Sequence, residues 1–145
     1  MEIWEENTGI SVLCKEVRPD SGGAGRFQGG AGQIIALRND TGAVVDAAFF
    51  GSRTSLPARG FGGGSDGSLR LLFVDGRPVV PKSRIDIMPG SVIELHEAGG
   101  GGFGHPVARR IDDVRRDLDA GLVSPDYVRR YYPRQAPEVL KQRKT

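Results

Sequence analysis

Three glycine clusters constrain what this chain can fold into more than any other feature of its sequence. They span residues 22–32, 60–67 and 99–104, and they hold 16 of the 22 glycines. Because glycine loses more backbone freedom on folding than any other residue, such clusters are either flexible linkers or places where backbones approach closely. The segments between them are apolar, rich in β-branched residues and interrupted by turn residues. That composition is typical of a folded β domain and not of an array of linkers.

Length and charge narrow the class of protein. A chain of 145 residues predicts one domain. The formal net charge of +2 argues against a dedicated nucleic-acid-binding protein, so nucleic acid is not an expected partner. Residues 1–104 carry 10 basic and 12 acidic side chains, whereas residues 105–145 carry 10 basic and 6 acidic. We interpret the basic C-terminal part as a solvated helical face, with a docking surface for an acidic partner as the main alternative.

The expected location is the cytoplasm. Cys14 is the one cysteine, which excludes an intrachain disulfide and a cysteine zinc cluster and fits a reducing compartment. The sequence has no run of about 18 apolar residues, so neither a membrane span nor a membrane partner is expected. The acidic N-terminus has no basic leader followed by an apolar stretch, so no secretory signal is expected.

Residues 1–104 predict a glycine-rich, mainly β domain of two small antiparallel sheets or a barrel-like arrangement. Alternation of apolar and polar residues, bounded by turn residues, places short strands at 10–17, 33–38, 43–50, 69–74, 77–80, 85–87 and 92–95. The turn residues 39–42 favour a hairpin that joins 33–38 to 43–50. Asp75-Gly76 favours a second hairpin between 69–74 and 77–80.

Residues 105–133 predict a short helical segment of two helices. Ile111, Val114 and Leu118 stand at helical spacing, and Gly121 occupies the position of a C-terminal cap. Ser124, followed by a proline, predicts the start of the second helix, which Pro133 ends. Residues 134–145 are basic, contain proline and are expected to form a mobile tail. The three parts are expected to make one structural unit.

The glycine clusters themselves allow three interpretations. The pattern G-x-G-x-x-G occurs at 62–67 and at 99–104, but the first match precedes a strand and His105-Pro106 interrupts the second, so nucleotide binding is disfavoured. Six pairs of glycines lie three residues apart, which is the period of polyproline II. We therefore favour extended, polyproline II-like segments that pack nearly backbone to backbone and exchange hydrogen bonds. Irregular glycine loops are the remaining alternative.

Histidines offer few candidates for catalysis or metal binding. His96 falls within a predicted strand and is interpreted as a surface or core residue. His105 lies between a glycine cluster and Pro106, where a helix-capping role is favoured over that of a ligand or an acid–base group.

Acidic and nucleophilic side chains add little. Asp112 and Asp113 are adjacent, so they point about 100° apart on a helix and do not form a dyad. Turn hydrogen bonding accounts for Ser65 and Asp66, and Cys14 is interpreted as a buried small hydrophobe. We therefore assign no catalytic, cofactor-binding or metal-binding residue, and leave open whether His105 or Asp66 contributes to a shared site.

The order of the glycine motifs resembles one known family. Residues 19–32 resemble the serine- and glycine-rich signature in the B subunit of hydantoinases and oxoprolinases, and residues 59–67 resemble that family's later glycine loop. Lys82 and residues 89–92 follow at matching places, and residues 98–104 and 121–124 resemble the family's C-terminal end. Family B subunits are several times longer, so the chain resembles only their C-terminal portion. Because it begins with its own Met1, we expect a separate small subunit.

This resemblance implies a role in a multi-subunit enzyme. We expect a structural small subunit of an ATP-dependent ketone carboxylase, similar to the small (gamma) subunit of the acetophenone carboxylase type, in which ATP activates a ketone and bicarbonate for carbon–carbon bond formation. The implied partners are larger hydantoinase A-like and B-like subunits, on which ATP and a divalent metal are expected, with no cofactor on this chain. The alternatives are a C-terminal piece of a hydantoinase or 5-oxoprolinase-type ATP-dependent amidohydrolase, and a free-standing β binding module.

The chain departs from the family pattern at three positions. The family commonly has tyrosine and aspartate where this chain has Phe103 and His105, and it commonly has an arginine near Gln28. If the acid or base that the family has at these positions contacts a site, the substrate role that the resemblance implies would not hold for this chain.

Overall fold

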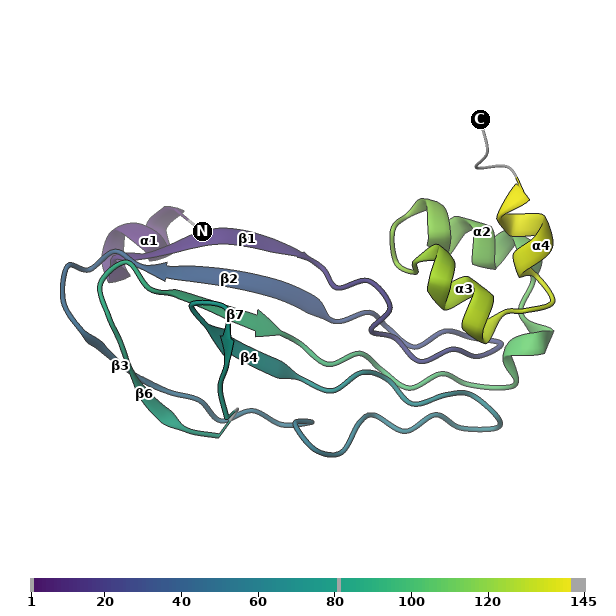
Figure 1. The fold of residues 1–145 in the computed structure, drawn as a ribbon, viewed down its shortest axis with the longest axis horizontal. Helices are drawn as coiled ribbons and strands as arrows, with labels where there is room; N and C mark the ends of the chain where they lie inside the picture. Colours follow the sequence, from purple (N-terminus) through teal and green to yellow (C-terminus); the bar gives the residue numbers. More distant parts are fainter. Residues whose placement is uncertain (1, 81, 142–145) are drawn as a thin grey trace.

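The computed structural model describes residues 2–80 and 82–141. The molecule is elongated, with the β-sheets and one helix at one end, the remaining helices at the other and long extended segments between them (Figure 1). The extended segments contain the three glycine clusters. These segments run side by side from the sheet end to the helical end (Figure 1).

Within residues 2–80 and 82–141, seven strands form two antiparallel sheets, which confirms the mainly β fold. The larger sheet has the order β1-β2-β7-β4-β5 and consists of β1 (Ile10–Val17), β2 (Gln33–Asn39), β7 (Val92–His96), β4 (Leu71–Val74) and β5 (Arg77–Pro78). The smaller sheet pairs β3 (Val45–Ala48) with β6 (Arg84–Ile87). Asp75 and Gly76 join β4 to β5 and both have positive φ, which fits the expected hairpin turn. The described strands do not close into a barrel.

The expected hairpin between 33–38 and 43–50 is wrong. β2 pairs with β1 and β7, whereas β3 pairs with β6 in the other sheet. The turn residues after β2 instead form a corner, because Asn39 is buried and its side-chain amide donates to the carbonyls of Ala43 and Ile87 at 2.8 and 2.9 Å. The long antiparallel pair formed by 33–48 and 84–96 therefore bends at Asn39 and continues into the second sheet.

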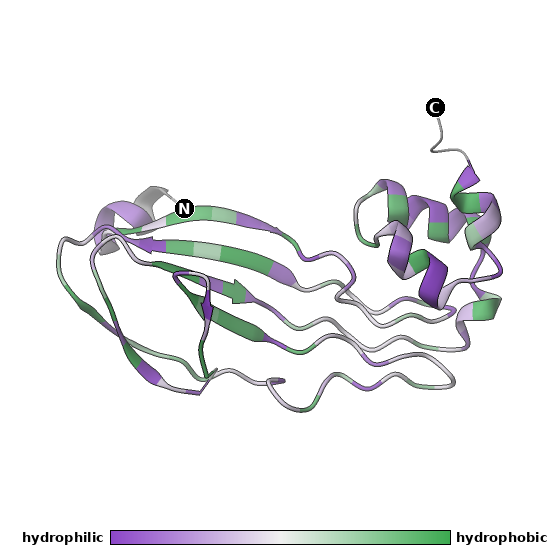
Figure 2. Cartoon of the chain, viewed as in Figure 1, coloured by the Kyte–Doolittle hydropathy of each residue, from purple (hydrophilic) through white to green (hydrophobic). Residues whose placement is uncertain are grey.

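The two sheets share one apolar core. Leu72, Ile87 and Ile93 are buried there, one each from β4, β6 and β7. Figure 2 shows hydrophobic residues concentrated on the strands of the larger sheet, whereas the extended segments lie near the middle of the hydropathy scale. Burial of apolar side chains therefore stabilises the sheet end, whereas other interactions must hold the extended segments together.

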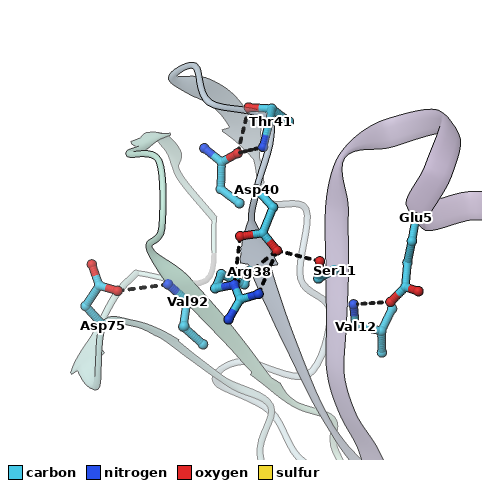
Figure 3. A network of polar contacts seen from close by, with 9 residues as sticks. Glu5, Ser11, Val12, Arg38, Asp40, Thr41, Asp75 and Val92 are labelled. Atoms are coloured by element: carbon cyan, nitrogen blue, oxygen red, sulfur yellow. Dashed lines mark hydrogen bonds and ion pairs between the residues drawn. The ribbon is translucent and has the colours of Figure 1, made fainter.

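The helix α1 (Glu2–Thr8), which the sequence analysis did not predict, precedes β1 at the sheet end. The Glu5 carboxylate accepts a hydrogen bond from the Val12 backbone N–H at 2.6 Å. Beside it, the Asp40 carboxylate pairs with Arg38 and accepts from the Ser11 hydroxyl (Figure 3). The hydrogen bonds from Arg38 and Ser11 hold the pKa of Asp40 below its usual value. These contacts fasten the helix and the corner to β1.

The other end contains η1 (Pro106–Ala108), α2 (Ile111–Asp119), α3 (Pro125–Tyr131) and α4 (Ala136–Val139). α2 and α3 are the two expected helices, and the Ser124 hydroxyl caps α3 by accepting from the Tyr127 N–H at 3.1 Å. α4 lies within the expected tail, and its Ala136 and Val139 are buried. Residues 142–145 of that tail lie outside the described residues. Within the described part of the chain, no helix has the length and apolar character needed to cross a bilayer.

The helices pack directly on the first glycine cluster. Ala24 is fully buried among the apolar side chains of α2, α3 and α4. The Tyr127 hydroxyl donates to the Gly22 carbonyl at 2.5 Å, and the Gly25 N–H donates to the Tyr132 hydroxyl at 3.3 Å. Two buried tyrosines thus tie the helices to the extended backbone.

We expect high pH to destabilise this contact through Tyr127. Burial raises the pKa of Tyr127, so the folded state keeps the phenol proton at pH values where the unfolded side chain, with a pKa of about 10, ionises. The contribution of Tyr127 to the free energy of unfolding is fully present below about pH 10. Above that pH it declines, by up to about 1.4 kcal/mol per pH unit. Tyr127→Phe should lessen this decline in urea unfolding at pH 8 and pH 11. Tyr131→Phe, on a less buried ring, is the control, and an unchanged decline in Tyr127→Phe would contradict the account.

Candidate interaction site at the end of the glycine bundle

The extended segments 19–26, 27–32, 57–61, 62–69 and 97–104 form what we call the glycine bundle. Segment 97–104 lies at its centre, because its successive glycines face three different neighbours. A Cβ atom on Gly99 or Gly102 would meet segment 19–26, at 1.9 Å from the Ser21 oxygen or 2.1 Å from the Ala24 oxygen. A Cβ atom on Gly101 would lie 2.1 Å from the Arg59 oxygen, and one on Gly100 would face Gly30 at 3.2 Å.

This arrangement repeats every three residues, which is the period of polyproline II. The same period appears in the neighbouring segments, where two further glycine pairs, Gly29 with Gly32 and Gly64 with Gly67, each face segment 97–104. The expectation of extended segments packed backbone to backbone is therefore confirmed.

Hydrogen bonds between segments hold the bundle together. The Gly23 N–H donates to the Gly100 carbonyl at 2.8 Å, and the Gly100 N–H donates to the Gly30 carbonyl at the same distance. The Gly102 N–H donates to the Ser65 carbonyl at 2.9 Å. These amides find their partners on neighbouring segments, so the bundle satisfies buried backbone groups without a conventional sheet.

Each glycine cluster carries one phenylalanine, and the three side chains meet at one end of the bundle. Phe27 and Phe61 flank Phe103, with ring centroids 6.2 and 6.0 Å from the central ring. Backbone bridges join Phe103 to both neighbours, so the stacking is fixed by the bundle itself. The three residues are 58%, 74% and 53% exposed, respectively. We call this surface the aromatic ladder.

Exposed aromatic rings on a rigid backbone are typical of a protein-binding surface, because they bury large apolar areas at low entropic cost. The Arg26 guanidinium lies 5.4 Å from the centroid of the Phe27 ring and adds a cation to the edge of the ladder. The sequence analysis missed this site. The signal was present, since each glycine cluster contains a single phenylalanine, but only the folded bundle brings the three together.

His105 lies just beyond Phe103 and caps η1, as expected. Its Nδ1 atom accepts a hydrogen bond from the Val107 N–H at 3.3 Å. Beside it, a pocket of about 520 Å³ opens between η1 and the residues at the end of α3. The side-chain oxygen of Gln28 lies 3.4 Å from the Tyr132 hydroxyl.

Asp66 hydrogen-bonds within the loop of the second glycine cluster, as expected, whereas Ser65 does not make the expected turn hydrogen bond and contacts the first cluster instead. The Ser65 hydroxyl accepts from the Ala24 N–H at 2.7 Å, and the Asp66 carboxylate accepts from the Gly60 N–H at 2.8 Å. Both hydrogen bonds connect backbone segments of the bundle. Both side chains therefore have a structural role, Asp66 within its own loop and Ser65 between two glycine clusters.

The other candidates are scattered over the molecule. Asp112 and Asp113 bind Arg115 and Arg116 separately, each within one turn of α2. His96 lies 3.4 Å from the Glu94 carboxylate, with its ring 5.0 Å from that of Phe73. Cys14 lies half-buried in β1, less enclosed than expected. Among residues 2–80 and 82–141, no group of three or more histidine, cysteine or acidic side chains could hold a metal.

The bundle, the two sheets and the aromatic ladder define a mainly β chain that is packed through its glycines. The sequence model of the family named hydantoinase B/oxoprolinase matches residues 1–106. The chain therefore belongs to the hydantoinase B/oxoprolinase family.

Relatives of this chain include parts of much longer proteins. It is 30% identical over 141 residues to caprolactamase subunit beta of Pseudomonas jessenii, which covers 91% of this chain and 24% of that subunit. It is 34% identical over 112 residues to 5-oxoprolinase of Dictyostelium discoideum, covering 72% of this chain and 8% of that protein. The chain thus spans about a quarter, or less, of these relatives.

Solved structures share the fold. The ATP-dependent caprolactamase of Pseudomonas jessenii superposes with a TM-score of 0.75 and 27% identity, over 88% of this chain and 24% of that one. The nucleotide-free acetone carboxylase superposes with a TM-score of 0.73 over 98% of this chain and 26% of that one, at 15% identity, which shows a common fold.

Proposed function

We propose that this chain is a small assembly subunit of a multi-subunit, ATP-dependent enzyme, and that it docks on its larger subunits through the aromatic ladder. The observation that carries this proposal is the ladder itself, in which three exposed phenylalanines lie on a backbone too tightly packed to rearrange. Family membership and the similarity to caprolactamase subunit beta support a place in a complex with larger subunits. Hydantoinase A-like and B-like subunits, carrying ATP and a divalent metal, are the proposed partners, in the cytoplasm.

Two reactions are candidates for the complex. Carboxylation of an aromatic ketone with bicarbonate, as in the acetophenone carboxylase type, is supported by the chained glycine motifs and by the fold shared with acetone carboxylase. ATP-dependent amide hydrolysis is favoured by the 30% identity to caprolactamase subunit beta. Assaying the purified complex for ATP-dependent turnover of acetophenone with bicarbonate, and of 5-oxoproline or caprolactam without it, separates the two. If no complex can be purified, a free-standing β binding module explains the chain better than a subunit does.

Replacing the ladder should detach the chain from its partners. Phe61→Ser combined with Phe103→Ser removes two exposed rings while leaving the glycine contacts unchanged. We expect the dissociation constant for the larger subunits to rise about 100-fold, which corresponds to about 2.7 kcal/mol. Val44→Ser, at an exposed apolar residue of the β2–β3 corner, is the control. Binding of the double variant as tight as that of the control would remove the ladder from the interface.

A further inference from the structure

The pocket beside His105 combines positive charge with an apolar wall. Its charged and polar lining consists of His105, Arg130, Arg134, Tyr131 and Gln135, and Pro106, Val107 and Pro133 complete it. No carboxylate is among these lining residues of the described chain. The Arg130 guanidinium rests 5.2 Å from the centroid of the Tyr131 ring, which positions it at the pocket.

The two arginines of this pocket form no ion pair among the described residues, whereas most arginines around them do. Ion pairs occupy Arg109, Arg115, Arg116 and Arg129. Within the part of the chain that the structure describes, neither Arg130 nor Arg134 forms one. Asp20 and Asp126 line a neighbouring pocket together with Arg130, but neither carboxylate forms an ion pair with Arg130. Arg130 and Arg134 therefore place two guanidinium groups without an ion-pair partner at one opening.

The backbone around the pocket is held in place. Gln135 is 3% exposed, and its amide nitrogen donates to the carbonyls of Pro106, Val107 and Arg109 at 3.3, 3.3 and 2.9 Å. These three bonds fasten η1 to the start of α4. The Val107 N–H occupies His105 Nδ1, so the neutral imidazole carries its proton on Nε2 and can donate it to a ligand.

We propose that this pocket binds a small oxyanion, a carboxylate or a phosphate. Guanidinium groups present paired N–H donors that match the oxygens of both anions, and an imidazole N–H adds a third donor. The preorganised backbone lowers the entropic cost of assembling the three groups around a ligand. The anion has two possible sources, a free small molecule or an acidic side chain of a partner subunit.

Titration of the full chain with sodium phosphate and with sodium acetate tests the proposal. The experiment follows the arginine Nε–H and histidine side-chain signals by NMR at pH 7, with sodium chloride keeping the ionic strength constant. We expect saturable shifts at His105 and the two arginines for at least one anion. Arg130→Ala with Arg134→Ala should weaken binding at least tenfold, whereas Arg129→Ala, which removes an ion-paired charge from the same helix, should change it less than twofold.

The controls separate this outcome from a general effect of charge. Arg130→Lys with Arg134→Lys keeps both charges and the fold but loses the paired donors, so it should bind with intermediate affinity. Shifts that never saturate, or that Arg129→Ala abolishes as strongly as the double variant, would overturn the proposal. In the complex purified from its source, phosphate binding that persists identifies a free anion, and binding that is lost while Arg130→Ala weakens assembly identifies a partner's carboxylate.

Discussion

Gly101→Ala and Gly102→Ala will each destabilise the fold severely. Each added methyl group would lie 2.1 Å from a carbonyl oxygen, on Arg59 or Ala24, and neither neighbour is a side chain that can turn away. The backbone segments would have to separate, which breaks hydrogen bonds along the bundle. We expect a loss of at least about 4 kcal/mol, a large share of the stability of a small domain. Circular dichroism and urea unfolding measure it.

Gly30→Ala is the matched control within the same bundle. A Cβ atom there meets nothing within 4 Å, and the residue is exposed. We expect its unfolding free energy to stay within about 1 kcal/mol of the original, or to rise, because alanine restricts the unfolded chain. Gly100→Ala, with a nearest contact at 3.2 Å, should fall between the two. Equal tolerance at Gly30, Gly101 and Gly102 would mean that these clusters are loops and not packed segments.

Asp117→Asn should be the most damaging change in the helical part. Asp117 pairs with Arg109, and their side chains are only 13% and 10% exposed. The guanidinium also donates to the Arg26 carbonyl at 3.2 Å and lies 5.9 Å from the centroid of the Tyr132 ring. Removing the carboxylate charge leaves a buried cation without compensation, which costs about 3 kcal/mol. Urea unfolding of the full chain measures the loss.

Asp126→Asn is the control for that change. Asp126 pairs with Arg129 on the surface of α3, where the side chains are 91% and 60% exposed. Solvent screens such pairs, so the urea midpoint should hardly move. If both variants lose the same stability, burial of the Arg109–Asp117 pair is not what gives it its weight.

Local sequence patterns predicted much of the fold. The alternation over 10–17 matches β1, the turn at Asp75 matches the β4–β5 hairpin, and Ser124 begins α3. The three-residue spacing of the glycines predicted the bundle. Each of these features is set by interactions between near neighbours, or by a steric limit that one residue type imposes wherever it stands.

Long-range pairing was not predictable in the same way. The residues after β2 have the composition of a hairpin turn, yet Asn39 bonds to Ile87, which lies 48 positions away, and redirects the chain into the second sheet. The aromatic ladder likewise depends on which segments become neighbours, since Phe27 and Phe103 are adjacent only in the folded bundle. The spacing of the glycines within one cluster does not determine which other cluster packs beside it.

Native mass spectrometry of the chain, captured by a tag from its own source, tests the central claim most directly. The account predicts that the 15.6 kDa chain is recovered with larger hydantoinase A-like and B-like subunits, in a complex that the Phe61→Ser and Phe103→Ser substitutions disrupt. Recovery of the chain alone at 15.6 kDa, at concentrations where the folded bundle is intact, would contradict it.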